Sequence, residues 1–424
     1  MRICIYEDSG AVWLEPLTLT RPAFALWCGA ERLFERLSRQ FAATELGFWI
    51  RPGLTELWKL DQPHHPANDG DWLREHSTVW INGRWLPATD AQIDAATPHV
   101  GDLNGQIAYA VLPGGEAPDA EEFAAWLCTW KDRLPMRSAS GIVLGYLWDF
   151  VDQNGATLKH DGDRWSAEHA SRPIPPHIAI TGPTERFLVA EDAVVEPFVF
   201  ADTRVGPVLI DRGAIVHSFS RLEGPCYVGR DSWILGAKLR AGSTLGPCCR
   251  IGGEVEESIV QGYSNKYHEG FLGHSYVGEW VNLAAATQTS DLRNDYDTVR
   301  VTVNGQRLDT GSGKVGSYFG DHAKTGLAAL LNTGSVIGAF ANVLPSGTLL
   351  PPVIPSFCQT QHGQIQVQSD LRKTFSTAAR VMQRRGKTLT DAHENFYYDL
   401  YDATAERRNQ VIRQSEMRAL RRIV

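Results

Sequence analysis

The sequence predicts a chain of two architectures, an α/β layered domain followed by a parallel β-helix, with helices at its carboxyl end. Three observations support this prediction. Strands alternate with amphipathic helices in the first part of the chain, aliphatic residues recur every six positions after residue 188, and helical spacing returns after Asp370. A length of 424 residues allows two or three domains, each with its own core.

The first part of the chain has four elements with clear apolar patterns. Strands are predicted at Met1 to Tyr6 and at Thr78 to Asn82, and a helix at Gly29 to Arg39. A second helix is predicted at Asp119 to Asp132, with Asp119 as its N-cap. Interleaved strands and helices are typical of an α/β domain. The apolar face of the second helix carries Phe123, Trp126, Leu127 and Trp130.

A six-residue repeat dominates the chain after residue 188. Its period is too long for the alternation of a strand or the turn of a helix, and it is typical of a parallel β-helix, in which six residues form one flat side of a triangular coil. The alternative is a β-sandwich, whose turns fall at irregular intervals of about 8 to 12 residues. The repeating positions are Ile210, Val216, Leu222, Val228 and Ile234, then Leu239, Leu245 and Ile251, and later Phe319, Thr325, Leu331, Ile337, Val343 and Leu349.

Two polar segments interrupt this repeat, Gly253 to Ser275 and Leu292 to Gly313. Loops that leave a rigid repeat are common places for chemistry, so we expect functional residues there. His268 lies in the first segment, and histidine is the usual general base near neutral pH. Its position alone does not distinguish this role from that of a surface or structural histidine.

The composition is that of an ordinary globular protein. Hydrophobic residues make up 43% and charged residues 21%, and 41 Lys and Arg against 49 Asp and Glu give a net charge of −8. This charge gives no reason to expect nucleic acid as a partner. We find no signal-peptide pattern and no apolar run long enough to span a membrane, so no membrane partner is expected. Seven scattered cysteines without a C-x-x-C pair predict reduced thiols.

Two segments carry a more specific pattern. Residues 264–296 read SNKYHEGFLGHSYVGEWVNLAAATQTSDLRNDY, and Gly320 to Gly326 read GDHAKTG. Together with Tyr146 to Asp149 and Pro16 to Pro22, they resemble the GlmU-related sugar-phosphate nucleotidyltransferase/acetyltransferase family. The resemblance covers nearly the whole chain.

The resemblance implies four parts in the chain. These are an α/β nucleotidyltransferase-like domain at 1–160, a linker at 161–184, a left-handed parallel β-helix at 185–357 and a helical tail at 358–424. A short β-helix has open ends and a flat exposed face, and the family implies a homotrimer. The acetyltransferase sites of related enzymes lie between neighbouring subunits.

The resemblance also implies an acetyltransferase site in the β-helix. The family's general base is the histidine of a His-x-x-x-Leu-Gly pattern, which matches His268 to Gly273. Asn282 matches an asparagine that binds the sugar-side substrate, although an Asn in the left-handed conformation at a coil corner is the alternative. Lys266, Asn294 and Tyr296 are further candidate contacts for the substrate.

Two positions depart from the family's acetyltransferase pattern. Glu256 stands where the bifunctional enzyme has a lysine for the sugar phosphate, and Phe271 replaces an aromatic hydroxyl. The identity of the sugar is therefore left open.

Acetyl-CoA is the implied acyl donor. The resemblance places it along Gly320 to Gly326 and the coils from Ile337 to Thr348. Each candidate contact also has a structural alternative. His322 would form hydrogen bonds at a coil corner, and Lys324 would be solvated on the coil surface. Gly338 and Ala339 would be small because a coil corner requires small residues. The candidate contacts are His322, Lys324, Thr325, Gly338 and Ala339.

For the amino-terminal domain, the resemblance implies nucleotidyl transfer from an NTP, UTP in the first place, to a sugar 1-phosphate with Mg²⁺. Trp27 stands where the family has an arginine, and tryptophan cannot donate two hydrogen bonds to a phosphate. Arg21 has an alternative role as the partner of Glu15 or Asp8, and Asp149, a candidate metal ligand, is also an ordinary cap residue. The candidate nucleotide-binding residues are Asp8, Arg21, Gly29, Asn82 and Arg84.

The sequence therefore predicts a cytoplasmic transferase of nucleotide-sugar synthesis for the cell envelope. Its β-helix would acetylate an amino sugar phosphate, and its first domain would attach a nucleotide. The alternatives are an enzyme with only one active half and a non-catalytic trimeric binding protein on the same folds.

Overall fold

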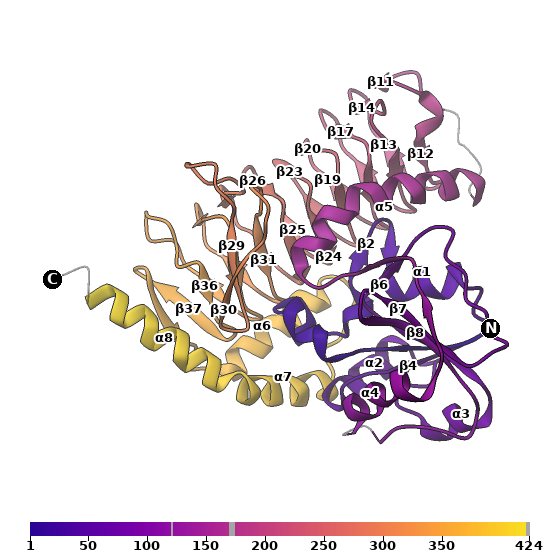
Figure 1. Cartoon of the computed structure of the whole chain (residues 1–424). Coiled ribbons are helices and arrows are strands. Elements are labelled where there is room, and N and C mark those ends of the chain that lie inside the picture. Colours follow the sequence, from indigo (N-terminus) through magenta and orange to yellow (C-terminus); the bar gives the residue numbers. More distant parts are fainter. Residues whose placement is uncertain (120–121, 169–173, 421–424) are drawn as a thin grey trace. The chain divides into compact units, whose positions relative to one another are not determined.

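The computed structural model describes residues 1–119, 122–168 and 174–420, and the chain divides into two compact units. Unit 1 comprises Met1–Leu14, Thr20–Leu26 and Glu31–Tyr146. Unit 2 comprises Glu15–Leu19, Trp27–Ala30 and Leu147–Val424. Figure 1 labels their elements, with unit 1 in indigo to purple and the repeats in magenta to orange.

Unit 1 is built on a mixed sheet of six strands in the order β4-β1-β5-β8-β7-β9. β1 lies parallel to both β4 and β5, whereas β8 is antiparallel to β5 and β7. The parallel centre follows from the sequence, because β1 has apolar residues at Ile3, Cys4 and Ile5 and is buried on both faces. The strands are β1 (Arg2–Tyr6), β4 (Glu45–Trp49), β5 (Thr78–Asn82), β7 (His99–Leu103), β8 (Gln106–Leu112) and β9 (Met136–Ser138).

Helices and short strands complete unit 1. The predicted aromatic face is confirmed, because Phe123 and Trp130 are buried against Tyr6 and Trp80. The predicted cap at Asp119 is wrong, since Glu122 is the residue that precedes the helix. The remaining bounds are α1 (Leu33–Gln40), α2 (Thr55–Asp61), α3 (Gly70–Glu75), α4 (Phe123–Arg133), β3 (Glu31–Arg32), β6 (Trp85–Pro87) and β10 (Gly141–Val143). Helix α1 therefore begins four residues later than predicted.

Unit 2 is a β-solenoid whose coils each contribute one strand to each of three sheets. Successive coils pair in parallel through the solenoid, as in β12 to β15 and β15 to β18. The first sheet contains β12 (Phe187–Val189), β15 (Val208–Ile210), β18 (Cys226–Val228), β21 (Ser243–Leu245), β24 (Ile259–Gly262), β27 (Tyr276–Glu279), β31 (Ser317–Phe319), β34 (Ser335–Ile337) and β36 (Val353–Ile354). We call this sheet A.

Two further faces close the coil. Sheet B contains β13 (Val194–Val195), β16 (Ile215–Val216), β19 (Trp233–Ile234), β22 (Arg250–Ile251) and β25 (Asn265–Lys266), and it continues in β32 (Lys324–Thr325), β35 (Asn342–Val343), β37 (Cys358–Gln361) and β38 (Gln364–Val367). Sheet C contains β11 (Ala179–Thr181), β14 (Phe200–Asp202), β17 (Arg221–Glu223), β20 (Lys238–Leu239), β23 (Glu254–Glu256) and β26 (Phe271–Gly273), followed by the pair β28 (Gln288–Thr289) and β33 (Leu330–Leu331).

The six-residue repeat is confirmed as the interior of this solenoid. Ile210 pairs with Val228 and Val228 with Leu245, and all three side chains are fully buried. Ile210 and Val228 are 228 − 210 = 18 positions apart, which is three sides of six residues. The last predicted member is wrong, because Leu349 is 58% exposed and its neighbour Leu350 is buried instead. Left-handed winding stays a prediction.

The two predicted interruptions differ from each other in the structure. Residues 253–275 do not leave the solenoid, because they form β23 to β26 in register with their neighbours. Residues 292–313 do leave it. They form a hairpin of β29 (Arg300–Val303) and β30 (Gln306–Asp309), and an antiparallel bridge between Leu292 and Lys314 closes its base.

The described part of unit 2 contains four α-helices. Helix α5 (Leu147–Glu168) packs on sheet A, where it contacts β12, β18, β21 and β27 (Figure 1). It therefore runs into the predicted linker, whose residues 169–173 lie outside the described chain. The predicted carboxyl-terminal helices are α6 (Leu371–Gln383), α7 (Asp391–Ala403) and α8 (Ala405–Leu420). None of the described helices has both the length and the apolar character needed to cross a membrane.

Candidate functional site

The carboxyl ends of β1 and β5 bring three predicted nucleotide-binding residues together in unit 1. These strands are parallel, with Tyr6 opposite Asn82, so the residues that follow them meet at one edge of the sheet. Arg84 donates from Nε to Asp8 Oδ1 and from Nη2 to Asp8 Oδ2, both at 2.7 Å. The amide of Asn82 donates to Asp8 Oδ2 at 2.9 Å.

This arrangement keeps the carboxyl of Asp8 ionised. Burial acts to raise its pKa, but the hydrogen bonds and charge of Arg84, with Asn82, outweigh burial and lower the pKa. Arg84 also donates from Nη1 to the carbonyl of Leu144 at 2.8 Å, so its donors are largely used within the protein. Gly10 permits this packing, because a Cβ there would lie 2.2 Å from Arg84 Nη2. The edge therefore offers a fixed carboxylate, with Arg84 as its positioning residue.

Of the other residues predicted for the nucleotide and metal sites, Arg21 lies in unit 1, where its partner Arg51 also pairs with Glu7 at 3.3 Å, whereas Gly29 and Asp149 belong to unit 2. Gly29 belongs to unit 2, where its N–H donates to Asn154 at 2.7 Å. The carbonyl of Arg21 accepts a hydrogen bond from Arg51 at 2.9 Å, while Glu15, considered as an Arg21 partner, pairs with Arg407. Asp149 lies in helix α5 of unit 2.

Trp27 has its own packing partner in unit 2. Its ring stacks on Tyr227 with centroids 5.7 Å apart, and its backbone N–H donates to the hydroxyl of Tyr276 at 2.8 Å. The tryptophan that replaces the family's arginine thus anchors its own segment on sheet A of unit 2.

His268 lies on the exposed turn between β25 and β26. Its ring contacts that of Tyr267, with centroids 5.1 Å apart, and forms no hydrogen bond with another described residue. The ring nitrogens are therefore open to a substrate. This availability is what a general base requires.

Lys266 holds the turn that carries His268. Its ammonium lies inside the solenoid, where it donates to the carbonyls of Gly252 at 2.8 Å, Gly270 at 2.6 Å and His268 at 3.4 Å. Burial lowers its pKa to about 8, because the charged form loses its hydration. With its donors used in this way, Lys266 positions the turn rather than facing a sugar phosphate.

The other three predicted contacts for the sugar are exposed. Asn282 forms β-bridges with Asn265 and Lys324, so it is extended, and the alternative of a left-handed coil corner does not apply to it. Trp280, with φ at 61°, takes that corner instead. Asn294 and Tyr296 are exposed in the segment that leaves the solenoid, Tyr296 by 78%.

The predicted acyl-CoA contacts are mostly buried. His322 is 1% exposed, stacks on Phe340 with ring centroids 4.6 Å apart, and lies at a coil corner with φ at 60°. Burial lowers the pKa of Lys324 to about 8, and its ammonium donates to the carbonyl of His322 at 3.0 Å. Thr325 is buried and bonds the backbone N–H of Ala284 at 2.9 Å.

Gly338 and Ala339 follow strand β34. The N–H of Ala339 donates to the hydroxyl of Ser356 at 3.0 Å, and Ala339 is fully buried. Gly338 lines a cavity at the carboxyl end of the solenoid.

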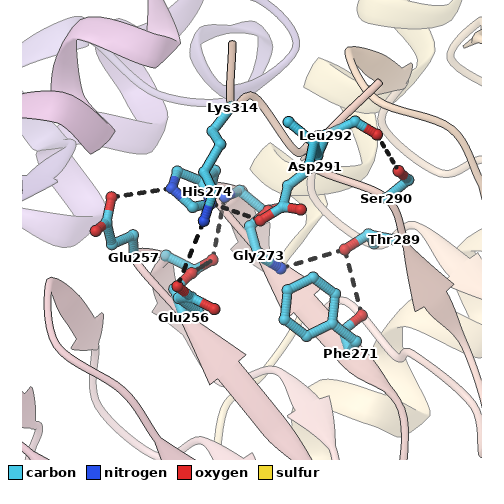
Figure 2. Close-up of polar contacts among 12 residues, drawn as sticks. Glu256, Glu257, Phe271, Gly273, His274, Thr289, Ser290, Asp291, Leu292 and Lys314 are labelled. Carbon is cyan, nitrogen blue, oxygen red and sulfur yellow. Dashed lines mark hydrogen bonds and ion pairs between the residues drawn. The ribbon is translucent and has the colours of Figure 1, made fainter. Parts of the chain in front are cut away.

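A polar cluster that the sequence reading missed lies at one corner of the solenoid (Figure 2). His274 donates from Nδ1 to Asp291 at 2.7 Å and from Nε2 to Glu257 at 3.0 Å, so both ring nitrogens are engaged. Gly273 makes room for this contact, because a Cβ there would lie 2.6 Å from Asp291 Oδ2. The cluster joins three successive coils.

Charge compensation dominates this cluster. Burial opposes the charged ring of His274, but its hydrogen bonds to Asp291 and Glu257 outweigh burial and raise its pKa to about 9. Lys314 lies beside it with its ammonium 3.8 Å from Glu256, which also lies 3.7 Å from Arg240. Glu256, the departure from the family's lysine, is thus one member of a network of ion pairs.

The cluster fixes the base of the hairpin segment. The N–H of Val315 donates to the carbonyl of Asp291 at 2.9 Å, and that of Gly316 to the carbonyl of His274 at 2.9 Å. An imidazolium with both N–H groups engaged cannot accept a proton, so His274 is not a general base in this arrangement. One signal was available in the sequence, because Glu257, His274 and Asp291 are each 17 positions apart, close to one coil.

The described residues contain no group of three or more His, Cys, Asp or Glu side chains arranged to hold a metal ion. Asp8 already accepts hydrogen bonds from Arg84 and Asn82. These residues do not fit the predicted Mg²⁺ site.

Comparison with known proteins agrees with both halves of the chain. Residues 3–170 match the family model described as sugar nucleotidyl transferase. A bifunctional sugar-1-phosphate nucleotidylyltransferase/acetyltransferase of Sulfurisphaera tokodaii is 35% identical over 96 residues, which are 23% of this chain and 24% of that protein. The bifunctional protein GlmU of Rippkaea orientalis is 28% identical over 184 residues, 38% of each chain. That of Jannaschia is 34% identical over 106 residues, 24% of this chain and 22% of that protein.

The chain thus matches 24%, 38% and 22% of these relatives' lengths. A solved Arabidopsis UDP-N-acetylglucosamine acyltransferase is 10% identical, with a TM-score of 0.29 over 56% of this chain and 90% of that one, a score that does not establish a shared fold. The resemblance predicted from the motifs is confirmed: this chain is related to bifunctional sugar-phosphate nucleotidyltransferase/acetyltransferases, and its residues 3–170 match the family model described as sugar nucleotidyl transferase.

Proposed function

We propose that this chain is a transferase of nucleotide-sugar synthesis in which the solenoid acetylates an amino sugar phosphate and the first unit transfers a nucleotidyl group to a sugar 1-phosphate. Acetyl-CoA and UTP are the proposed co-substrates, and glucosamine 1-phosphate is the first sugar to test. The observation that carries the proposal is the exposed ring of His268 on a turn whose sequence matches the family's acetyltransferase motif.

The two segments that carry the family resemblance contain three histidines, and only one of the three is available to act as a base. His274 uses both ring nitrogens in ion pairs, and His322 is buried in an aromatic stack. His268 alone among these three is exposed, with its ring nitrogens free of hydrogen bonds to described residues. It is therefore the one that can reach a substrate amine.

The acetyl transfer step uses this ring as a general base. A ring nitrogen of His268 takes a proton from the sugar amine as the amine attacks the thioester carbonyl of acetyl-CoA. The carbon–sulfur bond then breaks, the acetyl group stays on nitrogen as an amide, and coenzyme A leaves and regains a proton. Lys266 contributes by holding the carbonyl of His268 and so the direction of the turn.

In the first unit, the ionised carboxylate of Asp8 is the group available to a nucleotide or sugar. It lies at the carboxyl edge of the parallel strands, where ligands of α/β folds commonly bind, and accepts hydrogen bonds from sugar hydroxyls or base N–H groups. Arg84 and Asn82 fix its position. No step is assigned to a metal ion, because the described residues do not fit one.

A homotrimer and a cytoplasmic location complete the proposal. The homotrimer is supported by the relatedness to the bifunctional enzymes and by the open ends of a solenoid, which favour association, and the cytoplasmic location by the relatedness alone. Light scattering coupled to size-exclusion chromatography tests the trimer, since a mass of three times 46.9 kDa is expected.

A mass-spectrometric assay tests the two activities together. The purified chain is incubated with glucosamine 1-phosphate, acetyl-CoA, UTP and Mg²⁺, and N-acetylglucosamine 1-phosphate and the UDP-sugar are measured. Both products are expected. Acetylated sugar alone would favour an enzyme with one active half, and neither product, with other amino sugar phosphates also tried, would contradict the proposal.

A further inference from the structure

A cavity of about 670 Å³ lies at the carboxyl end of the solenoid, within unit 2. Its walls come from strands β34 and β36, the turn of the β29–β30 hairpin, the turn between β37 and β38, and helix α8. The volume is in the range of small-molecule sites.

One wall of the cavity is apolar. Val336 of β34 and Val353 of β36 face it, and Val411 lines it from helix α8. The strip from Pro351 to Pro355 adds three prolines, which carry no backbone N–H. This wall suits the hydrocarbon part of a ligand.

In addition to this apolar wall, the lining of the cavity contains a buried cation. Arg408 of helix α8 lines the cavity and is only 3% exposed. Its Nη1 donates to the carbonyl of Tyr401 at 3.1 Å and to the hydroxyl of Thr404 at 3.0 Å, and its guanidinium lies 4.0 Å from the centre of the Tyr401 ring. No carboxylate in the described part of the chain pairs with it. Its Nε and Nη2 donors have no partner among those residues either.

The other charges on the wall neutralise each other. Arg407 pairs with Glu15 and also donates to the side chain of Asn304 at the hairpin turn. Two arginines and one glutamate leave the wall with a net charge of 2 − 1 = +1 when His362 is neutral. A buried charge without a partner is costly, so an unpaired guanidinium facing a cavity points to an anion as the missing partner.

We propose that this cavity binds an organic anion, whose carboxylate or phosphate pairs with Nε and Nη2 of Arg408 and whose hydrocarbon part lies on Val336, Val353 and Val411. The planar guanidinium can donate two parallel hydrogen bonds to either group. The proposal does not rest on the transferase activities, because Arg408, Val336, Val353 and Val411 take no part in them, although the cavity is also lined by Gly338, a predicted acetyl-CoA contact.

Calorimetric titration of the full chain with octanoate, octyl phosphate and octanol tests this site. The two anions are expected to bind one per chain and octanol to bind at least about tenfold more weakly, because it lacks the charge-assisted hydrogen bonds. The tighter of the two anions identifies the preferred group. Equal affinity for octanol and both anions would overturn the proposal.

Two variants locate the binding. Arg408→Met is expected to weaken both anions to the level of octanol, while Arg413→Met, an exposed arginine of the same helix, leaves them unchanged. Unchanged anion binding in R408M would overturn the proposal. Should R408M fail to fold, Val353→Phe fills the cavity while keeping Arg408, and it is expected to abolish binding of all three probes. Retained anion binding in a folded V353F would contradict the site.

Discussion

Lys266 lies opposite Ile251 in neighbouring strands of sheet B, in the interior column that Ile234 and Val216 occupy in the preceding coils. It is therefore a lysine in an aliphatic position. Burying an ammonium among aliphatic side chains is costly unless its donors are satisfied. The carbonyls of Gly252 and Gly270 satisfy them and tie the core to the turn that carries His268.

Replacing Lys266 by Met is expected to lower acetyl transfer while leaving the solenoid folded. Methionine fits an aliphatic column, but it removes the donor that links the carbonyls of Gly252, Gly270 and His268, so the turn loosens although the N–H of Glu254 still bonds the carbonyl of Gly270. A misplaced catalytic group lowers the reaction rate by up to about 100-fold, and we expect kcat to fall while KM stays unchanged. Steady-state kinetics with circular dichroism checks both points.

The control for this variant is Lys238→Met, since Lys238 is exposed on sheet C. It should keep wild-type kinetics. Wild-type kcat in a folded K266M would show that the turn holds His268 without Lys266.

The ion pairs of His274 are expected to stabilise the chain most at low pH. Its folded pKa of about 9 exceeds the ordinary value of 6.5, so its contribution is complete below pH 6.5 and is lost as the pH rises through 9. A shift of this size corresponds to roughly 3 kcal/mol at about 1.4 kcal/mol per unit. Urea unfolding of the wild type and of His274→Gln should therefore differ more at pH 6 than at pH 9.5.

Asp291→Asn provides the internal check on this pH dependence. It removes one of the two carboxylates that hold the imidazolium, so His274→Gln should have a smaller and less pH-dependent effect in that background. A stability difference that grows between pH 6 and pH 9.5 would contradict the assignment.

Asp8→Asn is expected to abolish most nucleotidyl transfer and to spare acetyl transfer. The substitution keeps the shape of the side chain but removes the charge that Arg84 and Asn82 hold in place. Measuring both products in one reaction separates the two activities. Asp90→Asn, at an exposed aspartate of the same unit, is the control and should retain both. Equal loss of both activities in D8N would indicate a general structural effect instead.

The solenoid was predictable because each coil needs apolar side chains in its narrow interior, and these residues recur at a regular spacing in the sequence. Ile210, Val228 and Leu245 each meet the same interior demand, so their spacing records the length of a coil. The apparent break after Gly253 arose because Leu245 and Val260, which pair in adjacent coils, are only 260 − 245 = 15 positions apart. A shortened coil, with Lys266 in an interior position, hid a regular part of the fold.

The site was less predictable, because its contacts join residues that lie far apart in the sequence and meet only in the folded chain. His268, Asp8, Asn82 and Arg84 were all found through the resemblance to a family, and the parallel pairing of β1 and β5 brings the last three together. The His274 cluster needs the length of one coil to be known before its members can be aligned. The cap predicted at Asp119 failed because tertiary packing, not the capping residue, decides where α4 begins.

The most direct test of the central claim is the rate of coenzyme A release from acetyl-CoA with glucosamine 1-phosphate, compared for the wild type, His268→Ala and His177→Ala. His177 is an exposed histidine of the same unit and serves as the matched control. We predict that H268A, folded as judged by circular dichroism, loses about 100-fold or more in kcat, and that H177A is unchanged. A folded H268A with the wild-type rate would contradict His268 as the general base of this enzyme.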